Sequence, residues 1–174
     1  SMRFIKYILP VFVLFSCEPE KPKETIPVVE DNPAQKSVPA IHYTLVNTFP
    51  HDSTSFTEGF LFHNGQLFES SGAPENLPVT KSQFGIVDIK TGKIDKKGEL
   101  DRNKYFGEGI VFLKDKLYQL TGQGQTGFIY DAKNFKNMGT FGYMSKEGWG
   151  LTTDGKDLIM SDGTNAVTYL NPDN

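Results

Sequence analysis

The chain has 174 residues, of which 37% are hydrophobic, 22% are charged and 13% are aromatic, and its formal net charge is −3. This balance is ordinary for a globular domain and argues against nucleic acid or an acidic membrane surface as a partner. The single cysteine excludes a disulfide within the chain.

Residues 1–17 have the features of a targeting segment rather than of a folded domain. A short basic stretch with Arg3 and Lys6 precedes an apolar run, residues 7–15, that is too short to span a bilayer. Cys17 follows this run, a pattern that resembles a bacterial lipoprotein signal; a plain secretory signal with a chance cysteine is the alternative. We therefore expect lipidation of Cys17 and a lipid-anchored chain at the bacterial cell envelope, on its periplasmic or outer-membrane face.

Residues 18–40 are expected to form a disordered tether. Prolines interrupt this stretch, which is rich in glutamate and lysine and lacks the apolar residues that packing requires. Such a segment suits a spacer between a lipid anchor and the globular domain that we expect over residues 41–174. Residues 41–49 have strand character but precede the repeats described next.

Three copies of one pattern organise the globular part of the chain. The copies span residues 56–72, 106–122 and 148–163, so the pattern returns after about 40 to 50 residues, a period typical of repeat architectures. Three sets of residues align without gaps: Gly59, Gly109 and Gly150; Leu67, Leu117 and Leu158; and Gly72, Gly122 and Gly163.

Each copy predicts a β-hairpin followed by further strands. Short polar turns separate two apolar runs, at Asn64-Gly65, Lys114-Asp115 and Asp154-Gly155. Third strands are predicted over residues 85–92, 127–134 and 167–173, and fourth strands over residues 93–100 and 137–141. Four strands in each repeat indicate the blades of a β-propeller, an all-β fold. Because about four blades are the usual minimum for a closed ring, we expect residues 41–174 to be a partial propeller of about three blades.

Several motifs resemble those of the plant and bacterial glutamine cyclotransferases, which are five-bladed β-propellers unrelated to the zinc-dependent animal type. The resemblance runs from about Tyr43 to the end of the chain. It is carried by residues 56–59 (Phe-Thr-Glu-Gly), 68–72 (Phe-Glu-Ser-Ser-Gly), 105–109 (Tyr-Phe-Gly-Glu-Gly), 116–121, 127–131 and 148–155.

The resemblance implies a glutaminyl-peptide cyclotransferase, an acyltransferase that converts N-terminal glutamine to pyroglutamate and releases ammonia without a cofactor or metal. The α-amine attacks the γ-carboxamide carbon, so the reaction needs a base near the amine and an acid near the leaving nitrogen. One carboxyl group can do both if an apolar environment raises its pKa. Peptides or proteins with N-terminal glutamine are the expected partners, and a monomer is expected.

Glu69 is the predicted catalytic acid and base. It matches the family's proposed glutamate, and the equivalent repeat positions hold Gln119 and Met160, which suggests a task specific to this blade. The alternative is a glutamate satisfied by neighbouring backbone amides at the end of a strand.

Five further residues are predicted to bind substrate: Phe56, Glu58, Phe68, Glu108 and Trp149. Glu58, Glu108 and Trp149 each precede an aligned glycine at the start of an inner strand, which places them around the channel of a propeller. Glu58 stands where the family usually has glutamine. Alternatives remain for Glu108, which can orient backbone amides between blades, and for Trp149 and Phe56, which can pack in the core.

Two departures from the family pattern keep a second function open. The family usually has tryptophan where this chain has Gly122, and the loop over residues 73–83 is longer and looser than usual. Both departures are expected near the pocket, so the alternative is a catalytically inactive envelope propeller that binds peptides or proteins. His42, His51 and His63 are not spaced as a metal site and are more typical of surface residues.

Overall fold

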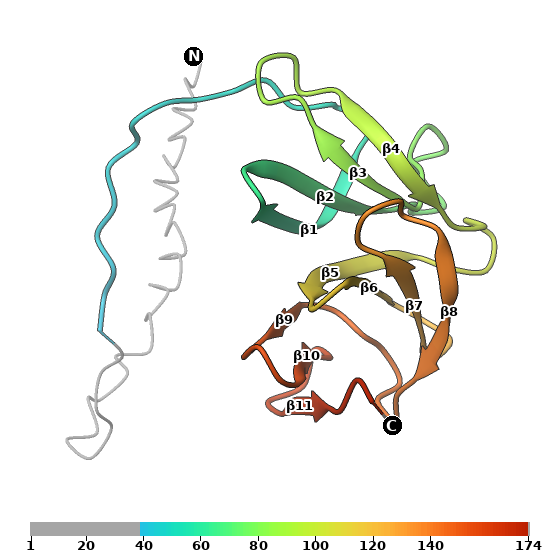
Figure 1. Ribbon diagram of the computed structural model, residues 1–174. Coiled ribbons are helices and arrows are strands. Elements are labelled where there is room, and N and C mark those ends of the chain that lie inside the picture. Colours follow the sequence, from blue (N-terminus) through green and yellow to red (C-terminus); the bar gives the residue numbers. More distant parts are fainter. Residues whose placement is uncertain (1–38, 174) are drawn as a thin grey trace, which may run out of the picture. The chain divides into compact units, whose positions relative to one another are not determined.

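The computed structural model describes residues 39–173 (Figure 1). The predictions for residues 1–17, with lipidation at Cys17, and for the tether up to residue 38 lie outside this range. The chain divides into two units, Ser1–Thr44 and Leu45–Asn174, and every strand within the described residues belongs to the second. The strand character expected over residues 41–49 is wrong: these residues are exposed, and residues 39–55 contain no strand. Within residues 39–173 no helix is long and apolar enough to cross a membrane.

The second unit contains three antiparallel sheets, one for each predicted repeat. The first holds β1 (Phe56–His63), β2 (Gln66–Gly72), β3 (Gln83–Val87) and β4 (Ile94–Glu99). The second holds β5 (Gly107–Leu113), β6 (Lys116–Thr121), β7 (Thr126–Asp131) and β8 (Asn137–Gly142). The third holds β9 (Leu151–Thr153), β10 (Leu158–Ser161) and β11 (Val167–Leu170). Each sheet follows chain order, as propeller blades do.

The predicted hairpin turns are confirmed. Asn64 and Gly65 join β1 to β2 with φ angles of 50° and 76°, the left-handed pair that a tight two-residue hairpin requires. Lys114 and Asp115 lie at the equivalent position between β5 and β6, and Lys114 also has a positive φ, of 57°. The polar pairs in the sequence therefore set the strand boundaries.

The first strands of the three sheets, β1, β5 and β9, lie next to one another, as Figure 1 shows. The aligned glycines allow this close approach. A Cβ atom at Gly109 would lie 2.6 Å from both the backbone nitrogen of Leu151 and the carbonyl oxygen of Trp149. The Gly109 N–H instead donates a hydrogen bond of 2.9 Å to the Trp149 carbonyl, which links the second repeat to the third.

Apolar side chains from neighbouring sheets fill the space between the blades. The larger cluster joins the first and second sheets and contains Phe68, Phe84, Leu100, Ile110, Phe112, Leu117, Phe128 and Tyr130. Two smaller clusters join the second and third sheets. These contacts hold the first strands in the register that forms the pocket described below.

Candidate active site

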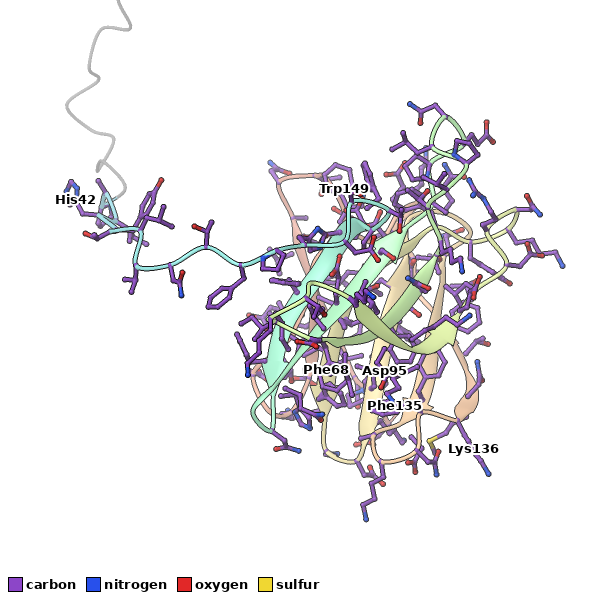
Figure 2. The ribbon with its side chains drawn as sticks, turned by 90° about the horizontal axis from the view of Figure 1, so that it is seen from above. His42, Phe68, Asp95, Phe135, Lys136 and Trp149 are labelled. Atoms are coloured by element: carbon purple, nitrogen blue, oxygen red, sulfur yellow. The ribbon has the colours of Figure 1, made fainter. Side chains whose placement is uncertain are left out.

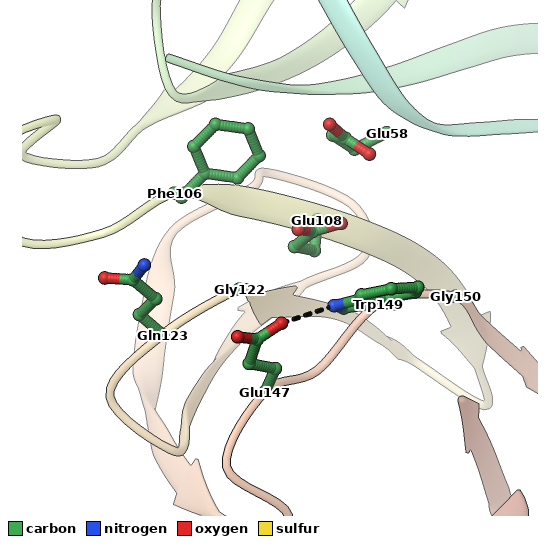
Figure 3. Close-up of a pocket in the computed structure, with 8 residues that line it drawn as sticks. All are labelled: Glu58, Phe106, Glu108, Gly122, Gln123, Glu147, Trp149 and Gly150. Carbon is green, nitrogen blue, oxygen red and sulfur yellow. Dashed lines mark hydrogen bonds between the residues drawn. The ribbon is translucent and has the colours of Figure 1, made fainter. Parts of the chain in front are cut away.

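A pocket of about 450 Å³ lies at the ends of the strands where β5 begins and β6 ends. Its volume falls in the range of ligand-binding pockets. Figure 3 shows the residues that line it, which come from all three repeats: Glu58, Phe106, Glu108, Gly122, Gln123, Glu147, Trp149 and Gly150. The sequence prediction that Glu58, Glu108 and Trp149 lie together is therefore confirmed as a placement.

Irregularities in the strand pairing place Glu58 and Glu108 in this pocket. Between β1 and β2 the register passes from Thr57 directly to Gly59, so Glu58 is an extra residue in its strand. A second shift, between Gly107 and Ile110, contains Glu108 in β5. Such bulges re-aim a side chain out of the regular alternation of a strand. Two repeats thus present a carboxyl group to the same pocket by the same device.

The environment of Glu108 favours its neutral form. Burial, followed by the negative charge of Glu58, raises the pKa of Glu108 to about 8. A hydrogen bond with Glu58 and the charge of Glu147 act in the same direction. Burial also raises the pKa of Glu58, although its hydrogen bond with Glu108 opposes this effect. The two carboxyl groups therefore bind protons more readily than free ones do, and at neutral pH Glu108 is the one that favours the neutral form.

Trp149 forms an aromatic wall of the pocket rather than part of the core. It is 46% exposed, and its Nε1–H donates a hydrogen bond of 2.8 Å to Glu147 Oε2, drawn as a dashed line in Figure 3. Gly163 lies against the back of the indole ring, where an added Cβ atom would be only 2.6 Å from it. The open face of Trp149 is consequently available to a ligand.

Gly122 lies in the pocket directly beside Glu108. A Cβ atom at this position would be 2.8 Å from Glu108 Oε1, so any side chain here displaces the carboxyl group. The loop that follows is held by Thr121, whose hydroxyl donates to the carbonyls of Gln123 and Thr126. The Tyr143 hydroxyl in turn donates to the Thr121 carbonyl at 2.6 Å. The glycine at position 122, where the family usually has tryptophan, thus leaves room for the Glu108 carboxyl group. The hydrogen bonds of Thr121 and Tyr143 hold this part of the pocket in place.

Glu69 lies outside the pocket and is completely buried. Its carboxylate accepts hydrogen bonds of 2.5 Å from the hydroxyls of Ser55 and Thr57, and His51 Nε2 lies 3.0 Å from both carboxylate oxygens. This environment is polar, in contrast to the apolar one that a single catalytic carboxyl was expected to need. The contacts tie the segment before β1 to β2.

The equivalent positions in the other repeats are also buried. Gln119 donates from Nε2 to Ser70 Oγ at 3.0 Å and accepts from the Tyr130 hydroxyl, and Met160 packs in an apolar cluster. Glu69, Gln119 and Met160 therefore differ in residue type because each of them contacts different neighbours in the interior. It does not by itself indicate catalysis.

Two of the predicted substrate-binding residues do not line this pocket. Phe68 is buried in the core, with its ring centroid 4.9 Å from that of Phe112, so it does not line the pocket. Figure 2 shows Phe68 well separated from Trp149. Phe56 does not line the pocket either, but its ring packs edge-on against Phe106 at 6.1 Å and supports that pocket wall.

The loop over residues 73–83 was expected near the pocket, and none of its residues lines it. Arg102 holds the loop through its guanidinium group, which donates to the carbonyls of Pro74, Pro78 and Thr80. The loop reaches the pocket only indirectly, through the Ser82 hydroxyl, which accepts a hydrogen bond of 2.6 Å from the Gly107 N–H at the start of β5.

Sequence reasoning missed several residues that the structure brings into contact with the site. Phe106, Gln123 and Glu147 line the pocket, and Phe106 was detectable because it aligns with Phe56 in the repeat. His51 is exposed, as expected, but its ring also contacts buried Glu69, and no sequence pattern signals this contact. Within residues 39–173 no group of three or more histidine, cysteine, aspartate or glutamate residues is arranged to hold a metal ion.

Comparisons with known proteins agree with the motifs. The profile of the glutamine cyclotransferase family matches residues 19–174. A glutaminyl-peptide cyclotransferase from Arabidopsis thaliana is 42% identical over 129 residues, which cover 74% of this chain and 38% of the plant protein. The crystal structure of Myxococcus xanthus glutaminyl cyclase superposes with a TM-score of 0.62 at 27% identity, covering 75% of this chain and 52% of that protein.

The chain thus spans about two fifths of the curated relative and about half of the solved one. The family match covers most of the chain, and the repeat motifs, the three sheets and the superposition all fall within the same residues. The all-β blades are those of a β-propeller, as predicted. The chain belongs to the glutamine cyclotransferase family.

Proposed function

We propose that this chain carries catalytic residues of a glutaminyl-peptide cyclotransferase, which converts N-terminal glutamine to pyroglutamate and releases ammonia. The family match and the 42% identity to a protein of that name support the proposal. The observation that carries it is the position of Glu108, a carboxyl group with a pKa of about 8 in a pocket with an aromatic wall.

The pocket supplies what the reaction requires of an acid and base. At neutral pH a carboxyl group with this pKa is protonated but gives up its proton readily, so Glu108 can protonate the leaving nitrogen and then accept a proton from the attacking one. Trp149 and Phe106 provide apolar surfaces against which the glutamine side chain can fold back toward its own amine. The proposal therefore assigns to Glu108 the role predicted for Glu69.

Glu69 has a different task in this proposal. Its carboxylate is fully buried and is engaged by Ser55, Thr57 and His51, so it has no open side toward a substrate. Thr57 is the residue immediately before Glu58 in the chain, and its hydroxyl is held by Glu69. Glu69 thereby positions the start of β1 and, through it, the carboxyl group of Glu58.

The test measures ammonia release from a peptide that begins with glutamine, using the full-length protein. Glu108→Gln is expected to abolish release, whereas Glu69→Gln and the exposed control Glu75→Gln are expected to retain it. A folded wild-type protein that releases no ammonia would overturn the proposed function. Release that survives Glu108→Gln but not Glu69→Gln would return the catalytic role to Glu69.

The proposal extends to location and assembly on sequence grounds. The apolar run before Cys17 supports a lipid anchor at the bacterial cell envelope, and peptides or proteins with N-terminal glutamine are the proposed partners. Labelling with a radioactive fatty acid, compared between wild type and Cys17→Ser, tests the anchor. A monomer is proposed, and sedimentation equilibrium tests it.

A further inference from the structure

The charged side chains that line the pocket are all carboxyl groups: Glu58 in β1, Glu108 in β5 and Glu147 just before β9 (Figure 3). Among the described residues, no lysine, arginine or histidine lines the pocket or forms an ion pair with any of the three. Lys146, the neighbour of Glu147 in the chain, lines a different hollow, together with Asp162. The pocket is therefore a region of negative charge that no nearby cation balances.

The carboxyl group of Glu108 is buried without a donor from the protein. The residue is only 8% exposed, and its side chain is turned into the pocket. The charged groups that act on it are two further carboxyl groups, Glu58 and Glu147, and within the described residues no N–H group or hydroxyl donates to it. Buried carboxyl groups ordinarily have a donor or an opposite charge beside them. The place for such a group lies in the pocket, where a ligand would sit.

The open face of Trp149 favours a cation for an independent reason. The residue is 46% exposed, the hydrogen bond from its Nε1–H to Glu147 fixes the ring, and Gly163 lies behind it. A lysine ammonium or an arginine guanidinium group over an indole face is attracted by the π electrons of the ring, more strongly when water is excluded. The charge of the pocket and its aromatic wall thus favour the same kind of ligand group.

The α-amine of a glutaminyl peptide does not supply this positive charge in the reacting complex. The amine needs its lone pair to attack the carboxamide carbon, so it must be neutral at that moment. Even with Glu108 neutral, the carboxylates of Glu58 and Glu147 are then left without an opposite charge. Pockets of about 450 Å³ hold ligands larger than one glutamine residue, so the next residue of the peptide has room to provide the cation.

Glu58 is the carboxyl group best placed to bind that cation. Glu147 already accepts the hydrogen bond of Trp149, and the environment of Glu108 favours its neutral form. Glu58 is half-buried and lies at the register shift of β1, outside the strand ladder. Its carboxylate lines the pocket and can therefore pair with a positively charged side chain that enters it.

We propose that the pocket selects peptides in which lysine or arginine follows the N-terminal glutamine, and that Glu58 is the specificity-determining residue. This inference rests on the proposed function, whose substrate class it narrows. It concerns binding alone and holds whichever carboxyl group of the protein transfers protons.

The test uses the fluorescence of Trp149, which is the single tryptophan of the chain and therefore reports on this pocket directly. The full-length protein is titrated with the amides of pyroglutamyl-lysine, pyroglutamyl-arginine and pyroglutamyl-methionine. These ligands cannot react further and have no α-ammonium group, so the lysine or arginine side chain carries the only positive charge. The lysine and arginine amides are expected to bind about tenfold more tightly than the methionine amide. In Glu58→Gln, which keeps the shape without the charge, the difference is expected to shrink to about twofold, the part that Trp149 contributes.

The outcomes separate this inference from the proposed function. Equal affinity for the lysine and methionine amides would overturn it, as would a preference that survives Glu58→Gln unchanged or fluorescence that no amide alters. The exposed variant Glu75→Gln is expected to keep the wild-type preference and controls for the loss of one carboxylate elsewhere. A folded wild-type protein that prefers the lysine amide but releases no ammonia from glutaminyl-lysine amide would instead overturn the proposed function and leave the binding preference established.

Discussion

The Nε2 atom of His51 lies 3.0 Å from each carboxylate oxygen of Glu69. His51 belongs to the segment before β1, whereas Glu69 lies in the middle of β2, so the contact closes this segment onto the first sheet. Ser55 and Thr57 add hydroxyl groups to the same carboxylate. The start of β1 is consequently fixed by contacts with β2 that lie outside the pocket.

Glu69→Gln is expected to reduce stability more than catalysis. The amide places an N–H group where a buried oxygen accepted hydrogen bonds, which lowers the free energy of unfolding by about 1–3 kcal/mol. Urea unfolding of wild type, Glu69→Gln and the exposed control Glu75→Gln measures the effect. Unchanged stability combined with complete loss of ammonia release would contradict the structural role of Glu69.

Stability is expected to fall with rising pH through the titration of Glu108. Because its pKa is about 8 in the folded protein and 4.5 ordinarily, the folded state holds a proton that the unfolded chain has lost between these values. The unfolded state binds fewer protons in this window, so this contribution to the free energy of unfolding decreases as the pH rises.

Glu108→Gln is expected to remove that contribution. The urea midpoint of wild type should decline more steeply between pH 5 and pH 8 than that of the variant. The basic limb of kcat for wild type is expected near pH 8, where Glu108 loses its proton. Equal slopes of stability against pH in both proteins would show that the pKa of Glu108 is not raised.

Gly122→Ala is expected to lower kcat with little change in stability. The added methyl group would lie 2.8 Å from Glu108 Oε1, and the flexible carboxyl end must move away. Misplacing a catalytic group by about 1 Å can cost up to about a hundredfold in rate. Gly142→Ala is the matched control, because its nearest contact would be an ordinary 3.8 Å. Wild-type kcat in Gly122→Ala would show that the position of Glu108 is not critical.

Arg102→Met is expected to loosen the loop over residues 73–83 without affecting catalysis. The variant loses the donors to three loop carbonyls but keeps much of the apolar side chain. Limited proteolysis should cut this loop faster than in wild type, while kcat and KM stay unchanged because the loop does not line the pocket. Lys104→Met, an exposed neighbour, is the control, and a large change in KM for Arg102→Met would place the loop in contact with substrate.

Most of the fold was predictable from the sequence because its signals are local. The turn residues Asn64 and Gly65 adopt the left-handed angles expected of them, and the repeats map onto sheets one to one. Residues 41–49 were misread because strand propensity says nothing about whether a pairing partner is present. The segment has several apolar side chains but is exposed throughout.

The candidate site was only partly predictable, since it depends on which way side chains point. The repeat alignment brought Glu58, Glu108 and Trp149 together correctly. It did not reveal that Glu69 faces His51 across a strand, because that contact joins residues from a loop and a strand with no common pattern. The alternation of β2 places Phe68 and Glu69 on opposite faces, and neither face is the pocket.

The two register shifts in β1 and β5 have a consequence for how this protein can change. The side chains of Glu58 and Glu108 occupy positions that the strand pairing does not use, so a substitution there leaves the cross-strand ladder as it is. The first and second sheets share this feature, whereas β9 pairs with β10 without a register shift. The chemical role of each carboxyl group can therefore be tested by substitution without disturbing the strand pairing.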